Sequence, residues 1–257
     1  NQVDLDKFQK FEAAADKLMG VLPLRESKPA LRLRKLGNVK TAGMPAAGLY
    51  VPGVNTIAVD FRDNSVESFV HEYGHFLDYN DKTGQILSMT PEFKEIVHAY
   101  RERLSTQTEL KGQAQKQSYY GTPTEVWARG FEAYLSNLGL QTPLLKTPEV
   151  YSTEPQYLPY QTPELTEKMQ YYFKQQFPDL EAKVKVFTQS LEAEEQKVEV
   201  VAESKEVEAA QEQTVQSPAA EEKVEPKQTE VSSEVQGKEP ANTSDDNTQS
   251  KVEESSK

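Results

Sequence analysis

Two histidines separated by three residues are the side chains in this sequence with the clearest chemistry. They stand in the stretch His71-Glu72-Tyr73-Gly74-His75, and residues four apart lie on one face of a helix. Their imidazoles can therefore bind one metal ion, and Glu72 lies close enough to take a proton from a metal-bound water. The chain contains no cysteine, so thiolate ligands are excluded. The pattern predicts a Zn²⁺ site with His71 and His75 as ligands and Glu72 as the general base.

The residues around this pattern predict a helix from about Ser65 to Asp78. Apolar residues recur there at helical spacing and predict one buried face; they are Val66, Phe69, Val70, Tyr73, Phe76 and Leu77. Asn64 and Glu67 have the spacing of a capping box, and Asp63 adds negative charge at the positive end of the helix dipole. Because the histidines flank the apolar face, we expect the metal where the helix meets the core.

The third ligand is less certain from spacing, since a catalytic zinc usually has three protein ligands and one open position. A second predicted helix, over 123–139, carries two candidate carboxylates, Glu125 and Glu132. They are seven residues apart and lie on nearly the same face, so spacing alone does not distinguish them. Glu125 also completes a capping-box pattern with Thr122. His98, the remaining histidine, has no ligand partner at motif spacing, and we do not expect it to bind metal.

Charge is unevenly distributed along the 257 residues. Residues 191–257 hold 18 acidic and 7 basic side chains, a net charge of −11, whereas residues 1–190 hold 23 and 22, a net charge of −1. The first part therefore lacks the positive charge typical of nucleic-acid-binding proteins. Residues 191–257 contain no aromatic side chain and too few apolar ones to offset the entropy of ordering. We expect a folded domain over 1–190 and an acidic low-complexity tail over 191–257, disordered or partly helical.

The sequence gives a few indications of partners and cellular compartment. No apolar run approaches the eighteen or so residues of a membrane span, and the N-terminus does not resemble a signal peptide. The chain begins at Asn1 rather than Met, which is compatible with a processed form or a piece of a longer protein. We expect a monomer that acts on a protein or peptide, without nucleic-acid or membrane partners. The cytoplasm, delivery to a host cell and secretion all remain open.

The remaining patterns predict an α+β fold that is mainly helical, with a small N-terminal sheet. Helical periodicity and stop signals predict helices over 4–19, 91–104, 123–139, 163–177 and from 178 onward. Alternation and turn residues predict strands over 30–36, 49–51 and 54–59, the last two forming a hairpin. The strand over 54–59 directly precedes the histidine helix and could present its edge to an extended peptide.

Loops over 37–48, 105–120 and 143–160 are expected to shape the walls of a cleft. We predict a loop over 41–48, which is rich in small residues, and a frayed helix or mobile loop over 105–118, which is rich in glutamine. The segment 143–160 contains four prolines and several aromatic residues, which predicts an extended segment packed over the domain.

Two stretches together resemble known metallopeptidases: 71–80 (HEYGHFLDYN) and 118–134 (SYYGTPTEVWARGFEAY). They are similar to gluzincins of the anthrax lethal factor and Pro-Pro endopeptidase group. They are more similar still to the zincin-like domains of large polyvalent proteins in bacteriophages and conjugative elements. In these families an H-E-x-G-H-x-x-D helix is followed by a tyrosine-containing loop and then by E-x-[FW]-A-x-x-F. The resemblance implies a zincin-like fold over roughly 30–180.

The resemblance also implies roles for individual residues. Glu125 matches the third zinc ligand, and Asp78 matches an aspartate expected to orient a ligating imidazole. A tyrosine before the glutamate stabilises the oxyanion in these families, and both Tyr119 and Tyr120 fit that position. Arg129 departs from the lethal factor pattern, which has an acidic residue there, so its surroundings must differ.

Taken together, the residues and the resemblance predict a zinc-dependent endopeptidase. The alternative is a zinc-binding accessory or interaction module of a larger phage or mobile-element protein, without peptidase activity. The intact Glu72 favours the enzyme, because a binding module has no need of a general base.

Overall fold

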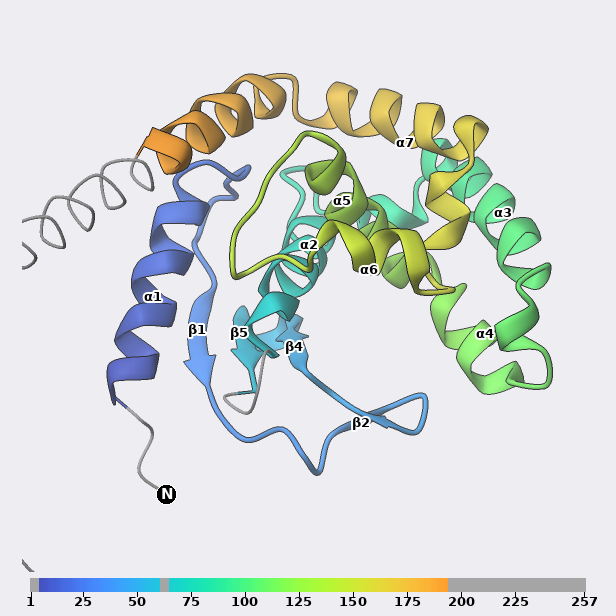
Figure 1. Ribbon diagram of the computed structural model, residues 1–257, viewed down its shortest axis with the longest axis horizontal. Helices are drawn as coiled ribbons and strands as arrows, with labels where there is room; N and C mark the ends of the chain where they lie inside the picture. Colours follow the sequence, from blue (N-terminus) through green and yellow to red (C-terminus); the bar gives the residue numbers. More distant parts are fainter. Residues whose placement is uncertain (1–4, 61–64, 194–257) are drawn as a thin grey trace, which may run out of the picture. The chain divides into compact units, whose positions relative to one another are not determined.

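The computed structural model describes residues 5–60 and 65–193 of the chain. These residues form an α+β fold that is mainly helical, with a small sheet built from the N-terminal part, as the sequence predicts (Figure 1). Asp63 and Asn64, and therefore the predicted capping box, lie outside the described residues. So do residues 194–257, which make up nearly all of the predicted tail.

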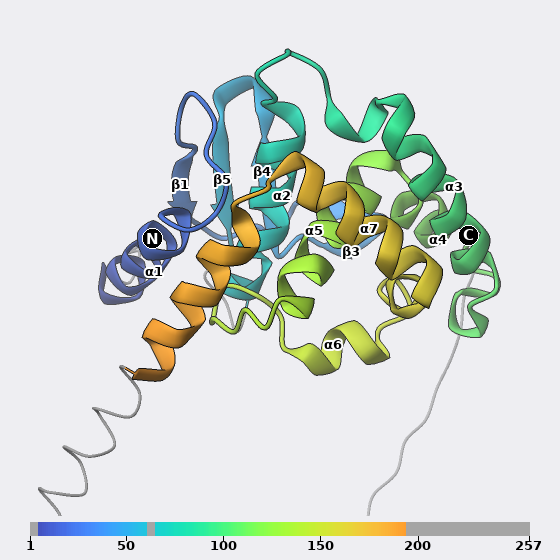
Figure 2. The same cartoon turned by 90° about the horizontal axis from the view of Figure 1, so that it is seen from above.

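Three strands form the sheet in the order β1 (Ala30–Leu33), β5 (Thr56–Val59) and β4 (Gly48–Val51). β5 runs parallel to β1 and antiparallel to β4, so the predicted hairpin is confirmed, with a 3₁₀ turn over Pro52–Val54. β5 is central and all four of its residues are buried. The prediction that this strand presents an edge is therefore wrong, because both its sides are paired. The edge nearest the histidine helix belongs to β4 (Figure 2).

The segment 41–48, predicted as a loop, contains most of a second small hairpin. β2 (Lys40–Thr41) pairs with β3 (Met44–Pro45). The two residues between them, Ala42 and Gly43, have φ angles of 51° and 82°, and two positive φ values in succession are typical of a tight two-residue hairpin turn. Pairing of so few residues leaves little periodic signal in the sequence.

The helices are α1 (Leu5–Met19), α2 (Phe69–Tyr79), α3 (Pro91–Ser105), α4 (Ala114–Tyr120), α5 (Pro123–Asn137), α6 (Pro148–Thr153) and α7 (Pro163–Gln176), and residues 180–193 are also helical. Further 3₁₀ turns cover Ser65–Ser68, Leu87–Met89, Thr108–Leu110 and Leu158–Gln161. Four of the helices, α3, α5, α6 and α7, begin at a proline that follows a threonine. Proline is favoured at the first helical position because its missing N–H needs no partner there. None of the described helices has the length and hydropathy needed to cross a membrane.

Two irregular segments contain more helix than the sequence predicts. The 105–118 segment ends in α4, and the 143–160 segment contains α6 and most of a 3₁₀ turn rather than an extended chain. The second segment nevertheless packs over the domain as expected, because Tyr151, Tyr157 and Tyr160 are all buried. Burial of these rings, rather than local periodicity, holds the segment in place.

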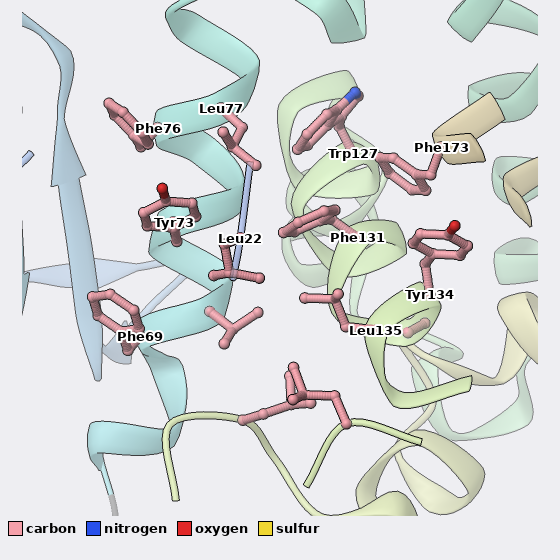
Figure 3. Close-up of a cluster of buried hydrophobic side chains, with 14 of the residues drawn as sticks. Leu22, Phe69, Tyr73, Phe76, Leu77, Trp127, Phe131, Tyr134, Leu135 and Phe173 are labelled. Carbon is pink, nitrogen blue, oxygen red and sulfur yellow. The ribbon is translucent and has the colours of Figure 1, made fainter. Parts of the chain in front are cut away.

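The contact between α2 and α5 forms the centre of the core. Phe69, Tyr73 and Phe76 point from α2 toward the sheet, while Trp127 and Phe131 point from α5 toward Phe173 of α7 (Figure 3). The two helices approach closely at Gly74, where a Cβ atom would lie 3.1 Å from the Cα atom of Ala128. Because Gly74 has no side chain, α2 and α5 can approach each other this closely. This close contact brings the start of α5 beside the two histidines of α2.

Candidate metal centre

The structure brings three predicted ligands together: His71 and His75 from α2 and Glu125 from the first turn of α5. Their ligand atoms all lie within 4.8 Å of one another. Oε2 of Glu125 is 3.3 Å from Nε2 of His71, and Oε1 is 3.4 Å from Nε2 of His75. Both imidazoles thus turn the same ring nitrogen toward one carboxylate. Two imidazole nitrogens and a carboxylate are a donor set that suits zinc.

An unsatisfied oxygen supports this assignment of a candidate metal site. Oε2 of Glu125 is buried and accepts no hydrogen bond from the described residues. Its neighbours are ion-pair contacts, with Nη2 of Arg129 at 2.8 Å and Nε2 of His71 at 3.3 Å. Leaving a buried carboxylate oxygen without a hydrogen bond is unfavourable. A cation held by His71, His75 and Glu125 would satisfy this oxygen, so the residues present fit a metal ion.

Surrounding charges keep Glu125 ionised. Burial alone would raise its pKa, but the guanidinium of Arg129 and contacts with the two histidines hold the pKa well below the ordinary value. Its position in the first turn of α5 also places the carboxylate near the positive end of that helix. The carboxylate is therefore in the charged form that a metal ligand requires.

Glu132, the other candidate carboxylate, lies behind His71. Its Oε2 accepts hydrogen bonds from Nδ1 of His71 at 2.8 Å and from the hydroxyl of Tyr157 at 2.7 Å. Its Oε1 accepts one from Nζ of Lys146 at 2.5 Å. A carboxylate bonded to Nδ1 fixes the imidazole and leaves Nε2 free for a metal. Glu132 thus orients His71. Glu125, not Glu132, is the carboxylate that contacts both His71 and His75.

These contacts strongly perturb both groups of the pair. Burial lowers the pKa of His71, but the charges of Glu132 and Glu125 outweigh it and raise the pKa to about 9. Burial opposes ionisation of Glu132 as well, yet Lys146 and His71 lower its pKa to about 2. His71 in the metal-free protein is therefore protonated at neutral pH. Sequence reasoning missed Lys146 and Tyr157, since both come from the aperiodic segment between α5 and α7.

Glu72 is buried between α2 and the edge strand β4. A Cβ atom at Gly48 would lie 2.7 Å from both Cγ and Oε1 of Glu72, so only glycine allows this approach. The backbone N–H of Tyr50 donates to the Glu72 carboxylate. Burial raises the pKa of Glu72, while the nearby histidines His71 and His75 oppose the rise. A raised pKa makes this carboxylate a better proton acceptor at neutral pH.

Of the two tyrosines, Tyr119 lies nearer the cluster. It lines the hollow that also contains both histidines and Glu125. Burial, the charge of Glu125 and a hydrogen bond to Glu125 all raise the pKa of Tyr119. The hydroxyl of Tyr120 instead points to Sδ of Met44, 4.0 Å away. Tyr119 is therefore the tyrosine whose hydroxyl can reach a group bound at the cluster.

A cleft opens over these side chains. It consists of two adjoining hollows of about 200 and 310 Å³. The first is walled by β4 and Tyr79, and the second by the β2–β3 hairpin and Tyr157. Residues common to both hollows are Thr41, Gly48, His71, Glu72 and Tyr119. The candidate metal centre thus lies at the floor of an open cleft.

Comparison with known proteins finds a family model that is similar to part of the chain. Residues 111–184 match the family model of large polyvalent protein-associated domain 1 (LPD1). This finding agrees with the predicted resemblance to domains of polyvalent proteins, and it carries no information about peptidase activity. No curated protein and no solved structure matches the chain.

The LPD1 segment supplies only one half of the site. It includes the residues contributed by α4, α5 and the irregular segment that follows, among them Tyr119, Glu125 and Glu132. It does not include α2 with His71 and His75, which lie upstream of residue 111. The histidines and the carboxylates therefore come together only when both parts of the fold are present.

Asp78, predicted to orient an imidazole, and His98, not expected to bind metal, have other hydrogen-bond and ion-pair partners. Oδ1 of Asp78 accepts a hydrogen bond of 2.6 Å from the backbone N–H of Ser88, and Oδ2 has no partner among the described residues. Burial raises the pKa of Asp78 to about 6. Asp78 therefore connects the end of α2 to the turn over Leu87–Met89, while the hydrogen bond to a cluster imidazole comes from Glu132. The side chain of His98 is 77% exposed, 3.4 Å from Glu102 on the same helix.

Proposed function

We propose that this protein is a zinc-dependent endopeptidase. The observation that carries the proposal is the convergence of His71, His75 and Glu125 beside Glu72 at the floor of an open cleft. The candidate metal site has three protein ligands, and the buried carboxylate of Glu72 lies beside it without being one of the ligands. Three-ligand sites that leave a coordination position free are typical of catalytic rather than structural zinc.

Glu72 would act as the general base and then as the general acid. Zinc, when bound, lowers the pKa of a coordinated water toward about 7 and polarises the scissile carbonyl. Glu72 takes the proton from the attacking water and delivers it to the leaving amine, which breaks the C–N bond. Its buried position and the N–H of Tyr50 hold the carboxylate in place for both transfers.

Tyr119 would stabilise the oxygen that becomes negative in the transition state. Its hydroxyl is protonated at neutral pH, as in any ordinary tyrosine, and its raised pKa keeps it so; it can therefore donate a hydrogen bond to the developing oxyanion. Removing one such donor typically reduces the rate by about 10²–10³-fold. We assign this role to Tyr119 rather than Tyr120, which faces Met44.

The substrate would be an extended peptide that lies along β4. This strand forms an edge of the sheet and lines the hollow above the cluster through Gly48, Leu49 and Tyr50. Unpaired backbone groups of an edge strand can pair with an added peptide strand. An open cleft with this edge favours cleavage within a chain.

Comparison of the wild type with Glu72→Gln tests the proposal. Both proteins would be loaded with zinc and incubated with a library of peptides prepared from a digested proteome, and new termini would be identified by mass spectrometry. We expect the wild type to cleave a subset of peptides and Glu72→Gln to retain one zinc while cleaving at least about 100-fold more slowly. Equal cleavage by the two proteins would contradict the role of Glu72.

A second candidate function is a zinc-binding module that mediates interaction within a larger protein. The match of residues 111–184 to a domain named for its association with large polyvalent proteins favours it. Zinc binding by the wild type without cleavage of any peptide in the library would support this alternative over the endopeptidase.

A further inference from the structure

Arg129 is a buried cation that contacts residues of the candidate site. It is only 5% exposed and follows Glu125 by one turn of α5. Its Nη2 lies 2.8 Å from Oε2 of Glu125. Its guanidinium carbon lies 5.2 Å from the ring centre of Tyr119 and 4.6 Å from that of Tyr120. One side chain therefore touches a candidate ligand, the candidate oxyanion donor and a neighbouring aromatic ring.

The positive charge of Arg129 balances Glu125 in the metal-free protein. Glu132, the other carboxylate of α5, already faces Lys146 and His71. Arg129 is closer to Glu125 than either histidine is. A buried carboxylate is strongly destabilised when its partner cation is missing. A metal ion bound to Glu125 would share the carboxylate with the guanidinium of Arg129. Repulsion between these two positive charges would reduce the electrostatic free energy gained when the metal binds.

The guanidinium also connects α5 to the end of α4, because it lies near the neighbouring rings of both Tyr119 and Tyr120. Planar guanidinium groups stack on aromatic rings, and such contacts are stronger when they are removed from water. Nη1 of Arg129 is buried and makes no hydrogen bond to the described residues. The contacts that hold the side chain are thus the ion pair with Glu125 and the cation–π contacts with the two rings. Loss of the planar group would free the ring of Tyr119 to turn away from the cleft.

We propose that Arg129 is a positioning residue that keeps the metal-free cluster assembled, moderates its affinity for metal and holds Tyr119 toward the cleft. The part concerning Tyr119 rests on the proposed function, whereas the effect on metal affinity does not require hydrolysis. The two effects have opposite signs, since removal of Arg129 strengthens zinc binding and weakens catalysis. A residue that only supports the fold would weaken both.

Zinc affinity of Arg129→Met, measured by competition with a chromophoric chelator at pH 7.5, tests this proposal. We expect this variant to bind zinc at least about tenfold more tightly than the wild type, with a lower melting temperature in the metal-free form. Arg129→Lys keeps the charge and should stay within about threefold of the wild-type affinity.

Arg25→Met is the matched control. Arg25 is also partly buried, pairs with Asp81 at 3.3 Å, donates to the carbonyl of Leu77 at 2.6 Å and lies over the ring of Phe177 at 5.6 Å, and none of these partners belongs to the cluster. Its removal should lower the melting temperature and leave zinc affinity unchanged. Should Arg129→Met fail to fold, Arg129→Gln takes its place, with the same expected tightening.

The possible outcomes separate this inference from the proposed function. If Arg129→Met and Arg129→Gln bind zinc no more tightly than the wild type does, the charge-balancing role is overturned. Full turnover of a cleaved peptide by Arg129→Lys overturns the role of stacking, because lysine cannot replace the planar group. Absence of zinc binding by the wild type itself contradicts the proposed function instead.

Discussion

At the scale of single residues, the two carboxylates of α5 differ in what faces them. Glu125 meets Nε2 of both histidines, whereas Glu132 meets Nδ1 of His71, Lys146 and Tyr157. The first arrangement leaves room for a cation, whereas in the second both carboxylate oxygens already accept hydrogen bonds. The same residue type on the same helix face therefore has two distinct tasks.

Replacing Glu132 tests its task. Glu132→Gln removes the negative charge that fixes His71 and leaves Lys146 without its partner, so we expect zinc affinity to fall about 10–100-fold and stability to fall by about 3 kcal/mol. Titration with zinc and urea unfolding measure the two effects. Glu164→Gln, which disrupts an exposed pair with Lys168, is the control and should change neither. Unchanged zinc affinity in Glu132→Gln would exclude the orienting role.

The raised pKa of His71 predicts how the stability of the metal-free protein depends on pH. Because the folded-state pKa of about 9 lies above the ordinary 6.5, this stabilisation is fully present below pH 6.5 and is lost as pH rises through 9. We expect the free energy of unfolding to decrease by about 2–3 kcal/mol between pH 6 and 9.5. Urea unfolding measures it, and His71→Gln should lack the decrease while His98→Gln retains it. A flat profile in the wild type would show that the charged pair does not form.

Sequence spacing was sufficient for some of these residues and not for others. His71, Glu72 and His75 share one helix, so their relative positions follow from helix geometry alone. The choice between Glu125 and Glu132 depends on how α5 packs across α2. Local sequence patterns do not encode this packing. A local signal did exist for Arg129, whose spacing of four from Glu125 predicts a contact on one helix face.

At the scale of elements, β4 packs closely against α2 because Gly48 has no side chain. Gly48 lies against Glu72 and Ser68 so closely that a Cβ atom would come within 2.7 Å of both. The strand thus packs against Glu72, the proposed general base, while Glu72 and both histidines line the cleft. A change at Gly48 should therefore affect Glu72 before it affects the metal ligands.

Gly48→Ala separates catalysis from metal binding. The added methyl group pushes the end of the Glu72 side chain aside, so we expect peptide cleavage to fall by about 10²-fold or more while one zinc per chain remains. Gly53→Ala, where a Cβ atom would meet nothing within 4 Å, should cleave normally. Loss of zinc from Gly48→Ala would mean that the strand supports the ligands as well.

Long, periodic elements were predictable, and short ones were not. The helices α1, α3, α5 and α7 and the β4–β5 hairpin carry strong apolar periodicity or turn signals and appear as expected. The β2–β3 hairpin, α4 and α6 each contain seven residues or fewer per element, and their contacts come from distant parts of the chain. The β2–β3 hairpin and α4 line the cleft, so the cleft was the least predictable feature.

At the scale of the whole molecule, the described residues beyond α7 belong to the core. Leu180, Val184 and Phe187 are buried, and burial of three such side chains contributes about 4–9 kcal/mol. This is comparable with the total stability of an ordinary domain, about 5–15 kcal/mol. The folded part therefore includes the helix over 180–193 as well as the LPD1 segment and α2.

Truncation tests this boundary. A chain that ends after residue 193 should bind one zinc and melt at the wild-type temperature, whereas a chain that ends after residue 179 should lose its cooperative thermal transition. Circular dichroism and elemental analysis measure both. A stable, zinc-binding protein that ends at residue 179 would contradict the contribution of the helix to the core.

The central claim is that His71, His75 and Glu125 hold one zinc ion, and zinc per chain is the measurement that tests it most directly. Elemental analysis would be made on the wild type, His71→Ala and Glu125→Ala after purification in the presence of zinc. The account predicts one zinc in the wild type and none in either variant. Absence of zinc from the wild type, or its retention in Glu125→Ala, would contradict the account.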